Sequence, residues 1–304
     1  MRPCEYVMKI GIPRALFYWK KPYFWETFFE NLGFEVLLSP ETHKEIIEKG
    51  VKIADSETCF SIKVLYGHIL ALEGKVDSIF IPRLKRNELG LEYCPKFFAL
   101  PDLFSLICKT PIISAWVDLK KESFREVLLK IAKELGKDRE ITERAIEKAL
   151  LKEKESKEKI KEDYFEKLKS QKKKIIFISH PYNLYDEYVN LRIKDKIENL
   201  GAEVIFIDEV QIQENQELRT EVKKEELPKF HWEFGPEILA QVREIIQHKV
   251  QGAIEISAFQ CGCDAALKEF IEKEFKENKI PFLYILIDEQ TGEAGLQTRL
   301  EAFF

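Results

Sequence analysis

Short apolar runs alternate along the chain with longer amphipathic stretches. The runs that predict strands lie at residues 7–12, 34–39, 76–81, 111–117, 174–179, 203–207, 252–256 and 281–287. The stretches that predict helices between them lie at residues 22–32, 41–50, 60–72, 187–200, 236–247 and 265–276. Strands that alternate with helices are typical of parallel sheets covered on both faces. We therefore predict an α/β protein.

The pattern changes between residues 118 and 174, where Lys and Glu dominate and proline is absent. Two helices are predicted here, at residues 122–135 and 140–170, and the second carries only a thin apolar stripe. Glu is interspersed throughout, which argues against a basic arm for nucleic acid. We predict an N-terminal α/β domain (1–118), a helical connector (119–172) and a C-terminal α/β domain (173–304).

The two α/β parts share a local pattern. Asn31-Leu32-Gly33 precedes the strand Phe-Glu-Val-Leu-Leu, and Asn199-Leu200-Gly201 precedes Ala-Glu-Val-Ile-Phe. Glycine tolerates the left-handed conformation that ends a helix, so both tripeptides predict helix ends. Two similar domains are the simplest architecture, with an acidic loop at residues 209–226 inside the second.

Composition narrows the classes of protein. The chain has 304 residues, of which 45% are hydrophobic, and a formal net charge of −5. These values exclude a disordered chain and a small disulfide scaffold, and they give no sign of nucleic-acid binding. Neither a secretory signal nor a membrane-spanning apolar run is evident, so we expect a cytoplasmic protein with its six cysteines reduced.

Three cysteines stand where parallel sheets place their ligands. Cys94 follows the strand that ends near Pro82, and Cys261 follows the strand that ends near residue 256, both at carboxyl ends. Cys59 begins a helix, where the backbone N–H groups and the helix dipole favour a thiolate. Three such thiolates suit zinc or an iron-sulfur cluster. Their spacing matches no compact metal motif, so ordinary buried cysteines are an equal alternative.

The other cysteines are weaker candidates. Cys108 stands among apolar residues and is expected in the core, and Cys4 is close to the terminus. Cys263 is left open as a ligand, a bystander or part of a second cluster.

Polar residues near the strand ends have two readings each. Arg14 either binds a phosphate or carboxylate, or it is a surface arginine or part of a structural ion pair. Lys63 either tunes a cluster or binds an anion, or it is a solvated helix residue. His180 is a proton donor or a hydrogen-bonded structural histidine. The chain has neither the Gly-x-Gly-x-x-Gly motif after its first strand nor a P-loop, which disfavours standard dinucleotide or ATP binding.

Several segments together resemble one family. They are residues 8–33, Glu57-Thr58-Cys59-Phe60-Ser61-Ile62-Lys63, Phe80-Ile81-Pro82-Arg83, Tyr93-Cys94-Pro95-Lys96, His180-Pro181-Tyr182-Asn183, Phe259-Gln260-Cys261-Gly262 and Arg299-Leu300-Glu301-Ala302-Phe303. With these segments the chain resembles the acyl-CoA dehydratase activase-related branch of the 2-hydroxyacyl-CoA dehydratase superfamily.

The resemblance implies two Rossmann-like (flavodoxin-like) domains that face a cleft, with a 4Fe-4S cluster held by Cys59, Cys94 and Cys261. The sequence departs from the family pattern at Cys263, where relatives commonly have proline. We expect ATP-coupled low-potential electron transfer or reductive chemistry with an activase-type ATPase as electron donor.

Several points stay open at this stage. The protein is alternatively a 2-hydroxyacyl-CoA dehydratase subunit, a double-cubane-type reductase or a non-enzymatic cluster carrier. Lyase or reductase activity and an acyl-CoA or other small-molecule substrate are therefore open, as is assembly into a homodimer or with a homologous subunit. No nucleic acid or membrane is expected as a partner.

Overall fold

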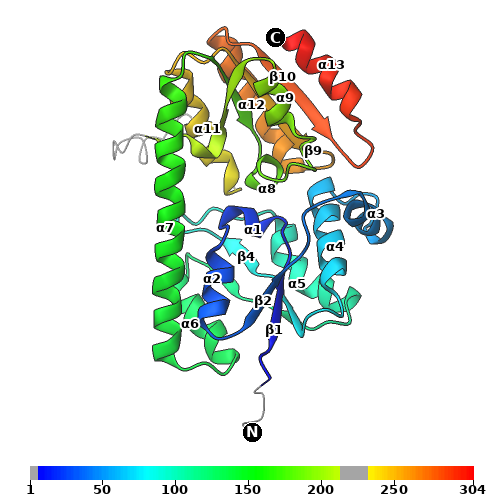
Figure 1. Cartoon of the computed structure of the whole chain (residues 1–304), viewed down its shortest axis with the longest axis vertical. Helices are drawn as coiled ribbons and strands as arrows, with labels where there is room; N and C mark the ends of the chain where they lie inside the picture. The colour runs from blue at the N-terminus through cyan, green and yellow to red at the C-terminus, as the bar shows by residue number, and fades with distance from the viewer. Residues whose placement is uncertain (1–5, 213–231) are drawn as a thin grey trace. The chain divides into compact units, whose positions relative to one another are not determined.

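The computed structural model describes residues 6–212 and 232–304. Cys4 and residues 213–226 of the predicted acidic loop lie outside them. The chain packs as two compact units, the first made of Met1–Ala54 and Lys63–Ser156 and the second of Asp55–Ile62 and Lys157–Phe304 (Figure 1). The second unit thus takes a short segment from early in the chain.

The first unit is built around a parallel sheet. Its elements are β1 (Lys9–Ile12), α1 (Phe17–Lys20), α2 (Phe24–Asn31), β2 (Glu35–Leu38), α3 (Lys44–Ile53), α4 (Phe60–Leu72), β3 (Ser78–Phe80), β4 (Arg83–Arg86), α5 (Pro95–Ile107), β5 (Ile112–Ile113), β6 (Trp116–Asp118), α6 (Phe124–Glu134) and the start of α7 (Arg139–Lys169). The sheet order is β2-β1-β3-β5, and β4 pairs with β6 separately. Gly11 of the central strand pairs with Leu37 on one side and Ile79 on the other.

The second unit has a parallel sheet of the same order. Its elements are β7 (Lys173–Ile178), α8 (Pro181–Leu184), α9 (Ile193–Asn199), β8 (Ala202–Phe206), the 3-10 helix η1 (Ile207–Glu209), α11 (Phe234–Ile246), β9 (Gly252–Ala258), α12 (Gly262–Glu277), β10 (Phe282–Ile287) and α13 (Glu293–Phe303). The sheet order is β10-β9-β7-β8. Starting from β8, the strands are the second, first, third and fourth of their sheet in chain order. The sheet β2-β1-β3-β5 of the first unit has the same order.

Burial explains why these runs form strands. All seven residues of β9 are buried, because helices cover both faces of a central parallel strand. The predicted helix ends are also found, since Gly33 and Gly201 have φ values of +83° and +87°, which only glycine adopts readily. The protein is therefore an α/β protein with parallel sheets, as predicted.

Two local predictions need correction, and two longer helices were missed. Helix α9 begins at Ile193 instead of residue 187, because Leu191 and Arg192 have φ values of 56° and 51°, outside the helical region. The single strand predicted at 111–117 is divided into β5 and β6, which join different sheets. Helices α5 and α13 were not predicted at all.

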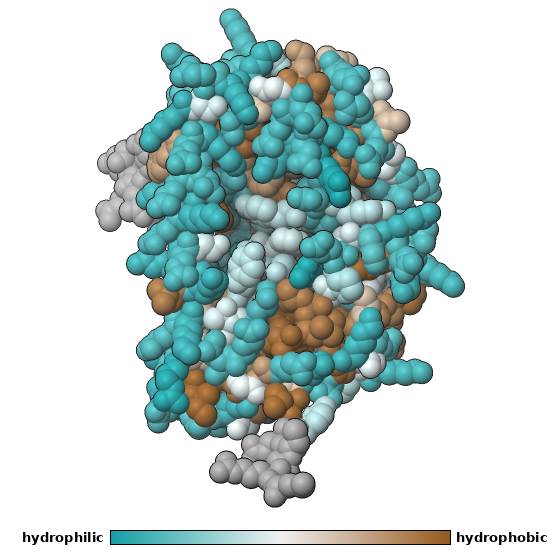
Figure 2. All heavy atoms as spheres, viewed as in Figure 1, coloured by the Kyte–Doolittle hydropathy of each residue, from teal (hydrophilic) through white to brown (hydrophobic). Residues whose placement is uncertain are grey.

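Aromatic rings fill the core of the first unit. Phe24, Phe28 and Phe29 are fully buried on α2, and Trp25 packs on Phe80 of β3 with ring centroids 4.6 Å apart. Polar side chains cover most of the face shown in Figure 2. Within the described residues, no helix combines the length and apolar character needed to cross a membrane.

Helices α3 and α4 cross at two glycines. A Cβ at Gly67 would lie 1.9 Å from the carbonyl oxygen of Ile46, and one at Gly50 would lie 2.0 Å from that of Lys63. Any larger residue at either position would push the two backbones apart, so these glycines are required by the close approach.

Candidate functional site

Two of the predicted cysteines lie on neighbouring segments of the second unit. The backbone N–H of Phe60 donates to the carbonyl oxygen of Phe259 at 3.1 Å, and Nε2 of Gln260 donates to Glu57 at 3.3 Å. These bonds join the segment that carries Cys59 to the loop that carries Cys261. The cysteines are far apart in sequence, so their shared location follows from the packing of residues 55–62 on the second unit.

A buried polar network anchors the Cys59 segment. Ser61 Oγ donates to Asn183 Oδ1 at 3.1 Å, and Asn183 Nδ2 donates to Ser179 Oγ at 3.0 Å. Ser179 Oγ in turn donates to the carbonyl oxygen of Ile256 at 2.6 Å. The network ties the first turn of α4 to the ends of β7 and β9, and it fixes the backbone around Cys59.

Each of the three predicted cysteines stands at the start of a helix. Cys261 is the N-cap residue of α12 and Cys94 that of α5, while Cys59 directly precedes the first residue of α4. Unpaired N–H groups and the helix dipole give such positions a positive potential that favours a thiolate. Cys94 belongs to the first unit, whereas Cys59 and Cys261 belong to the second.

The Cys261 thiol is set to ionise easily. Hydrogen bonding from Cys263 is the largest influence, and with His180 it lowers the pKa of Cys261 to about 6, against the opposing effects of burial and Asp264. By contrast, burial raises the pKa of the Cys108 thiol, at the end of α5, to about 11. Thiolate is the form that binds metals, so Cys261 is the better ligand of the two.

His180 and Asp264 form a buried pair beside Cys261. His180 Nε2 lies 2.6 Å from Asp264 Oδ1, and both residues are at most 5% exposed. Burial acts to lower the pKa of His180, but the charge and hydrogen bond of Asp264 outweigh it and raise the pKa to about 10. The second carboxylate oxygen, Oδ2, accepts the backbone N–H of Ala258 at 3.2 Å.

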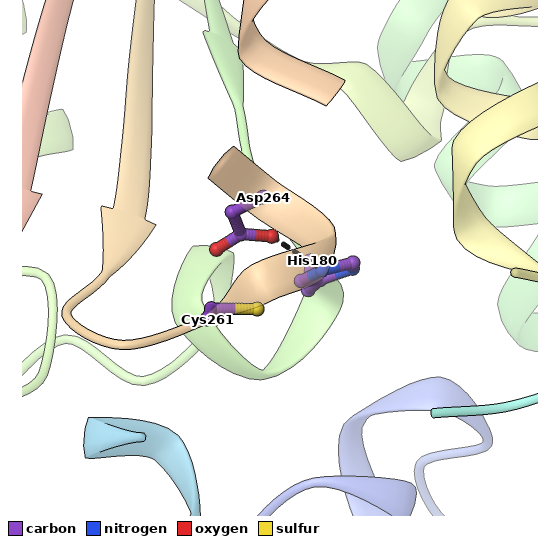
Figure 3. A group of neighbouring side chains, drawn as sticks. All are labelled: His180, Cys261 and Asp264. Carbon is purple, nitrogen blue, oxygen red and sulfur yellow. Dashed lines mark ion pairs between the residues drawn. The ribbon is translucent and has the colours of Figure 1, made fainter. Parts of the chain in front are cut away.

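Together, His180, Cys261 and Asp264 make a group that could hold a metal ion. One ligand atom from each lies within 4.8 Å of the others. Figure 3 shows the Cys261 sulfur and the Asp264 carboxylate on the same side of the His180 ring, both directed toward it. Soft sulfur and imidazole ligands together suit zinc or iron.

Aromatic rings enclose this group. Tyr182 stacks on the His180 ring at a centroid distance of 5.1 Å, and Phe234 meets it edge-on at 4.5 Å. Burial raises the pKa of the Tyr182 hydroxyl well above its ordinary value, and the charges of Cys261, Asp264, Cys59 and Cys263 add to the rise. Residues of both segments therefore contribute to the electrostatic environment of this one buried hydroxyl.

The remaining candidates lie in the first unit. The Arg14 guanidinium is 3.5 Å from Glu41, and its backbone N–H donates to Ser39 Oγ. Arg14 therefore forms an ion pair, which is one of the predicted alternatives. Lys63 is 5% exposed, so the reading of a solvated helix lysine is wrong.

Two residues of the site went unnoticed as site residues in the sequence. Asp264 lies three positions after Cys261, in the first turn of a helix, where an acidic residue complements the dipole and usually has no further role. Asn183 was noted only within the segment His180-Pro181-Tyr182-Asn183 that resembles the family. Neither residue type carries a signal until the fold brings its partners together.

Comparison with known families decides the identity of the chain. Residues 9–210 match the family described as "CoA enzyme activase uncharacterised domain (DUF2229)". The chain belongs to this family. The activase-related match includes Cys59, Cys94 and His180, whereas Cys261 and Asp264 lie beyond its end.

Solved structures add little to this family assignment. A zinc-bound variant of AdcAII from Streptococcus pneumoniae is 12% identical over 97% of this chain and 96% of that chain, with a TM-score of 0.30. The laminin-binding protein Lmb of Streptococcus agalactiae is 10% identical over 98% of each chain, also with a TM-score of 0.30. Likeness this low carries no argument about fold or function. No curated protein matches the chain.

Proposed function

We propose that this activase-related protein carries a 4Fe-4S cluster held by Cys59, Cys94 and Cys261, and acts in low-potential electron transfer or reductive chemistry. The observation that supports the proposal most is the Phe60–Phe259 backbone bond, which joins the Cys59 and Cys261 segments in one unit. Membership of the activase-related family supports it further.

The chemistry of the ligand set fits such a cluster. Each of the three thiols begins a helix, where the positive potential stabilises thiolates and the negative charge of a thiolate-ligated cluster. Cys261 also has a pKa lowered to about 6, mainly by hydrogen bonding from Cys263, so it is readily deprotonated at neutral pH. When bound, the cluster would supply one-electron chemistry at low potential.

The residues of the chain then have separate tasks. The Asn183 network holds the Cys59 segment in place, and the rings of Tyr182 and Phe234 keep water from the imidazole next to Cys261. Exclusion of water and hydrogen bonds to the sulfurs are two of the means by which proteins tune cluster potential.

We also propose that the electron comes from an activase-type ATPase on a separate chain. The sequence has no P-loop and no dinucleotide-binding glycine motif, so ATP hydrolysis is assigned to the partner. In the same picture, the two units are Rossmann-like domains that face a cleft containing the cluster.

The test is metal analysis of the full chain purified without oxygen. We expect brown protein with about four irons and four acid-labile sulfides per chain, as a 4Fe-4S cluster requires. The Cys59→Ser, Cys94→Ser, Cys261→Ser triple variant should be colourless while retaining the helical content of the wild type. A colourless wild type without iron, or one with stoichiometric zinc, would overturn the proposal.

A further inference from the structure

The His180 ring has one occupied nitrogen and one without a partner. Nε2 is engaged by Asp264 at 2.6 Å, whereas Nδ1 is buried and makes no hydrogen bond of normal geometry with any residue that the structure describes, although the Cys261 thiol is close enough to act on the ring. The side chain as a whole is 3% exposed. A buried polar atom without a partner costs free energy, so its presence needs an explanation.

The ring cannot easily turn to satisfy Nδ1. Tyr182 stacks on one face at an interplanar angle of 26°, and Phe234 packs against the ring at 66°. The strong bond to Asp264 fixes the remaining freedom of the imidazole. The unpartnered nitrogen is therefore held in a fixed direction within the group that also contains the Cys261 sulfur.

Both carboxylate oxygens of Asp264 are already engaged by protein groups. Its Oδ1 is used by His180, and its Oδ2 accepts the backbone N–H of Ala258 at 3.2 Å. A metal bound to either oxygen would have to share that oxygen with one of these bonds. Cys261 and His180 are left as the two members of the group best placed to bind a metal directly.

We propose that His180 binds, through Nδ1, the same metal centre that Cys261 binds, and that Asp264 holds the imidazole by Nε2. A metal-ligating histidine usually donates its other N–H to a carboxylate, and this is the arrangement observed. The inference rests on the proposed function only for the identity of the metal centre. If that centre is the proposed 4Fe-4S cluster, its three cysteines would leave one iron without a thiolate, and His180 would supply a nitrogen ligand to that iron.

A cobalt titration tests the inference without any cluster. The full-length metal-free chain is titrated anaerobically with Co²⁺ alone, and thiolate-to-cobalt charge transfer reports the bond to Cys261. We expect His180→Gln and Asp264→Asn to weaken Co²⁺ binding by about 10- to 100-fold while the charge-transfer band persists.

A matched control exists in the same unit. His248 also pairs with a carboxylate, Glu244, at 3.4 Å, but it is partly exposed and is no member of the metal group. His248→Gln should bind Co²⁺ as the wild type does. Thermal unfolding of each metal-free variant shows whether the fold is kept. Wild-type affinity in a folded His180→Gln variant, or no Co²⁺ binding by the wild type, would overturn the inference.

A second readout uses the cluster-loaded chain labelled with ¹⁵N-histidine. Pulsed EPR of the reduced cluster should show nitrogen coupling in the wild type and in His248→Gln, and none in His180→Gln. A cluster without this coupling overturns the inference and leaves the proposed function intact. If the wild type itself retains no iron, the proposed function fails, and the cobalt titration alone decides the role of His180.

Discussion

The backbone N–H of Phe60 donates to the carbonyl oxygen of Phe259 at 3.1 Å, a bond that joins residues 259 − 60 = 199 positions apart. Each of the two residues lies within two positions of a predicted cluster cysteine. The position of Cys59 relative to Cys261 is therefore set by the backbones of the two segments that carry them.

Single cysteine substitutions should separate ligands from bystanders. Cys59→Ser, Cys94→Ser and Cys261→Ser are each expected to lower the iron content of the anaerobic protein by at least half, because serine is a poor ligand for iron. Cys108→Ser should keep its iron, since burial holds the pKa of that thiol at about 11. Iron content and visible absorption check both expectations. Loss of iron on changing Cys108 but not Cys94 would contradict the ligand assignment.

Asn183 should be needed for the Cys59 segment to dock. Asn183→Ala leaves Ser61 and Ser179 without their shared partner inside the protein, which costs about 1–3 kcal/mol of unfolding free energy. We expect weaker iron retention together with this loss, measured by denaturant unfolding and iron analysis. Asn31→Ala is a suitable control, because its amide bonds to the backbone of its own helix at Thr27, in the first unit. Equal iron loss in both variants would argue against a local role.

His68 should make the first unit sensitive to acid. It is fully buried, with Ser39 Oγ 2.8 Å from Nδ1 and Thr42 Oγ1 2.9 Å from Nε2. Burial, with smaller effects from Arg14 and His43, lowers the pKa of His68 to about 3. Below pH 6.5, the ordinary pKa of histidine, the unfolded chain therefore binds a proton at His68 that the folded protein does not bind. The contribution of neutral His68 to the unfolding free energy is complete above this pH and is lost as the pH falls toward 3.

The expected size of this effect is about 2 kcal/mol between pH 6.5 and pH 5. Denaturant unfolding of the wild type and of His68→Gln at several pH values measures it as the difference between the two proteins, because buried Asp208, whose pKa is raised by burial to about 7, changes stability in the opposite direction over this range. The same pH dependence of the unfolding free energy in both proteins would refute the prediction.

The crossing of α3 and α4 should tolerate no side chain at Gly67. In Gly67→Ala the new Cβ would meet the Ile46 carbonyl oxygen, and separating the helices should cost about 1–3 kcal/mol or more. Gly295→Ala offers a contrast, because that helical glycine has no atom within 4 Å of the added Cβ and should gain about 0.5–1 kcal/mol. Thermal unfolding of both variants compares the two. A stabilised Gly67→Ala protein would mean that the helices do not approach this closely.

Much of the fold was predictable, because apolar runs and glycine ends are local signals. Helix α4 was predicted at its observed bounds, and the stops at Gly33 and Gly201 were found. The early start predicted for α9 failed because residues 191 and 192 read as helix formers, and nothing local marks their positive φ.

The site was predictable only in part. The helix-start position of Cys59 could be recognised, since it depends on neighbours along the chain. The His180–Asp264 pair could not, because its two residues meet only when β7 and β9 lie side by side in the sheet. The packing of residues 55–62 with the second unit could not be predicted either, since an amphipathic pattern shows where a helix begins and not what its first turn contacts.

The packing of residues 55–62 with the second unit imposes an order on folding. Residues 55–62 leave the ribosome before every strand of the sheet whose unit they complete, so they must wait for β9 and close a long loop to reach it. Closing a long loop late in folding is slow, because its entropy cost comes before its contacts are made. A metal centre built on both segments would therefore be acquired only by a finished chain. A C-terminal fragment beginning at Lys157 would lack part of its own unit.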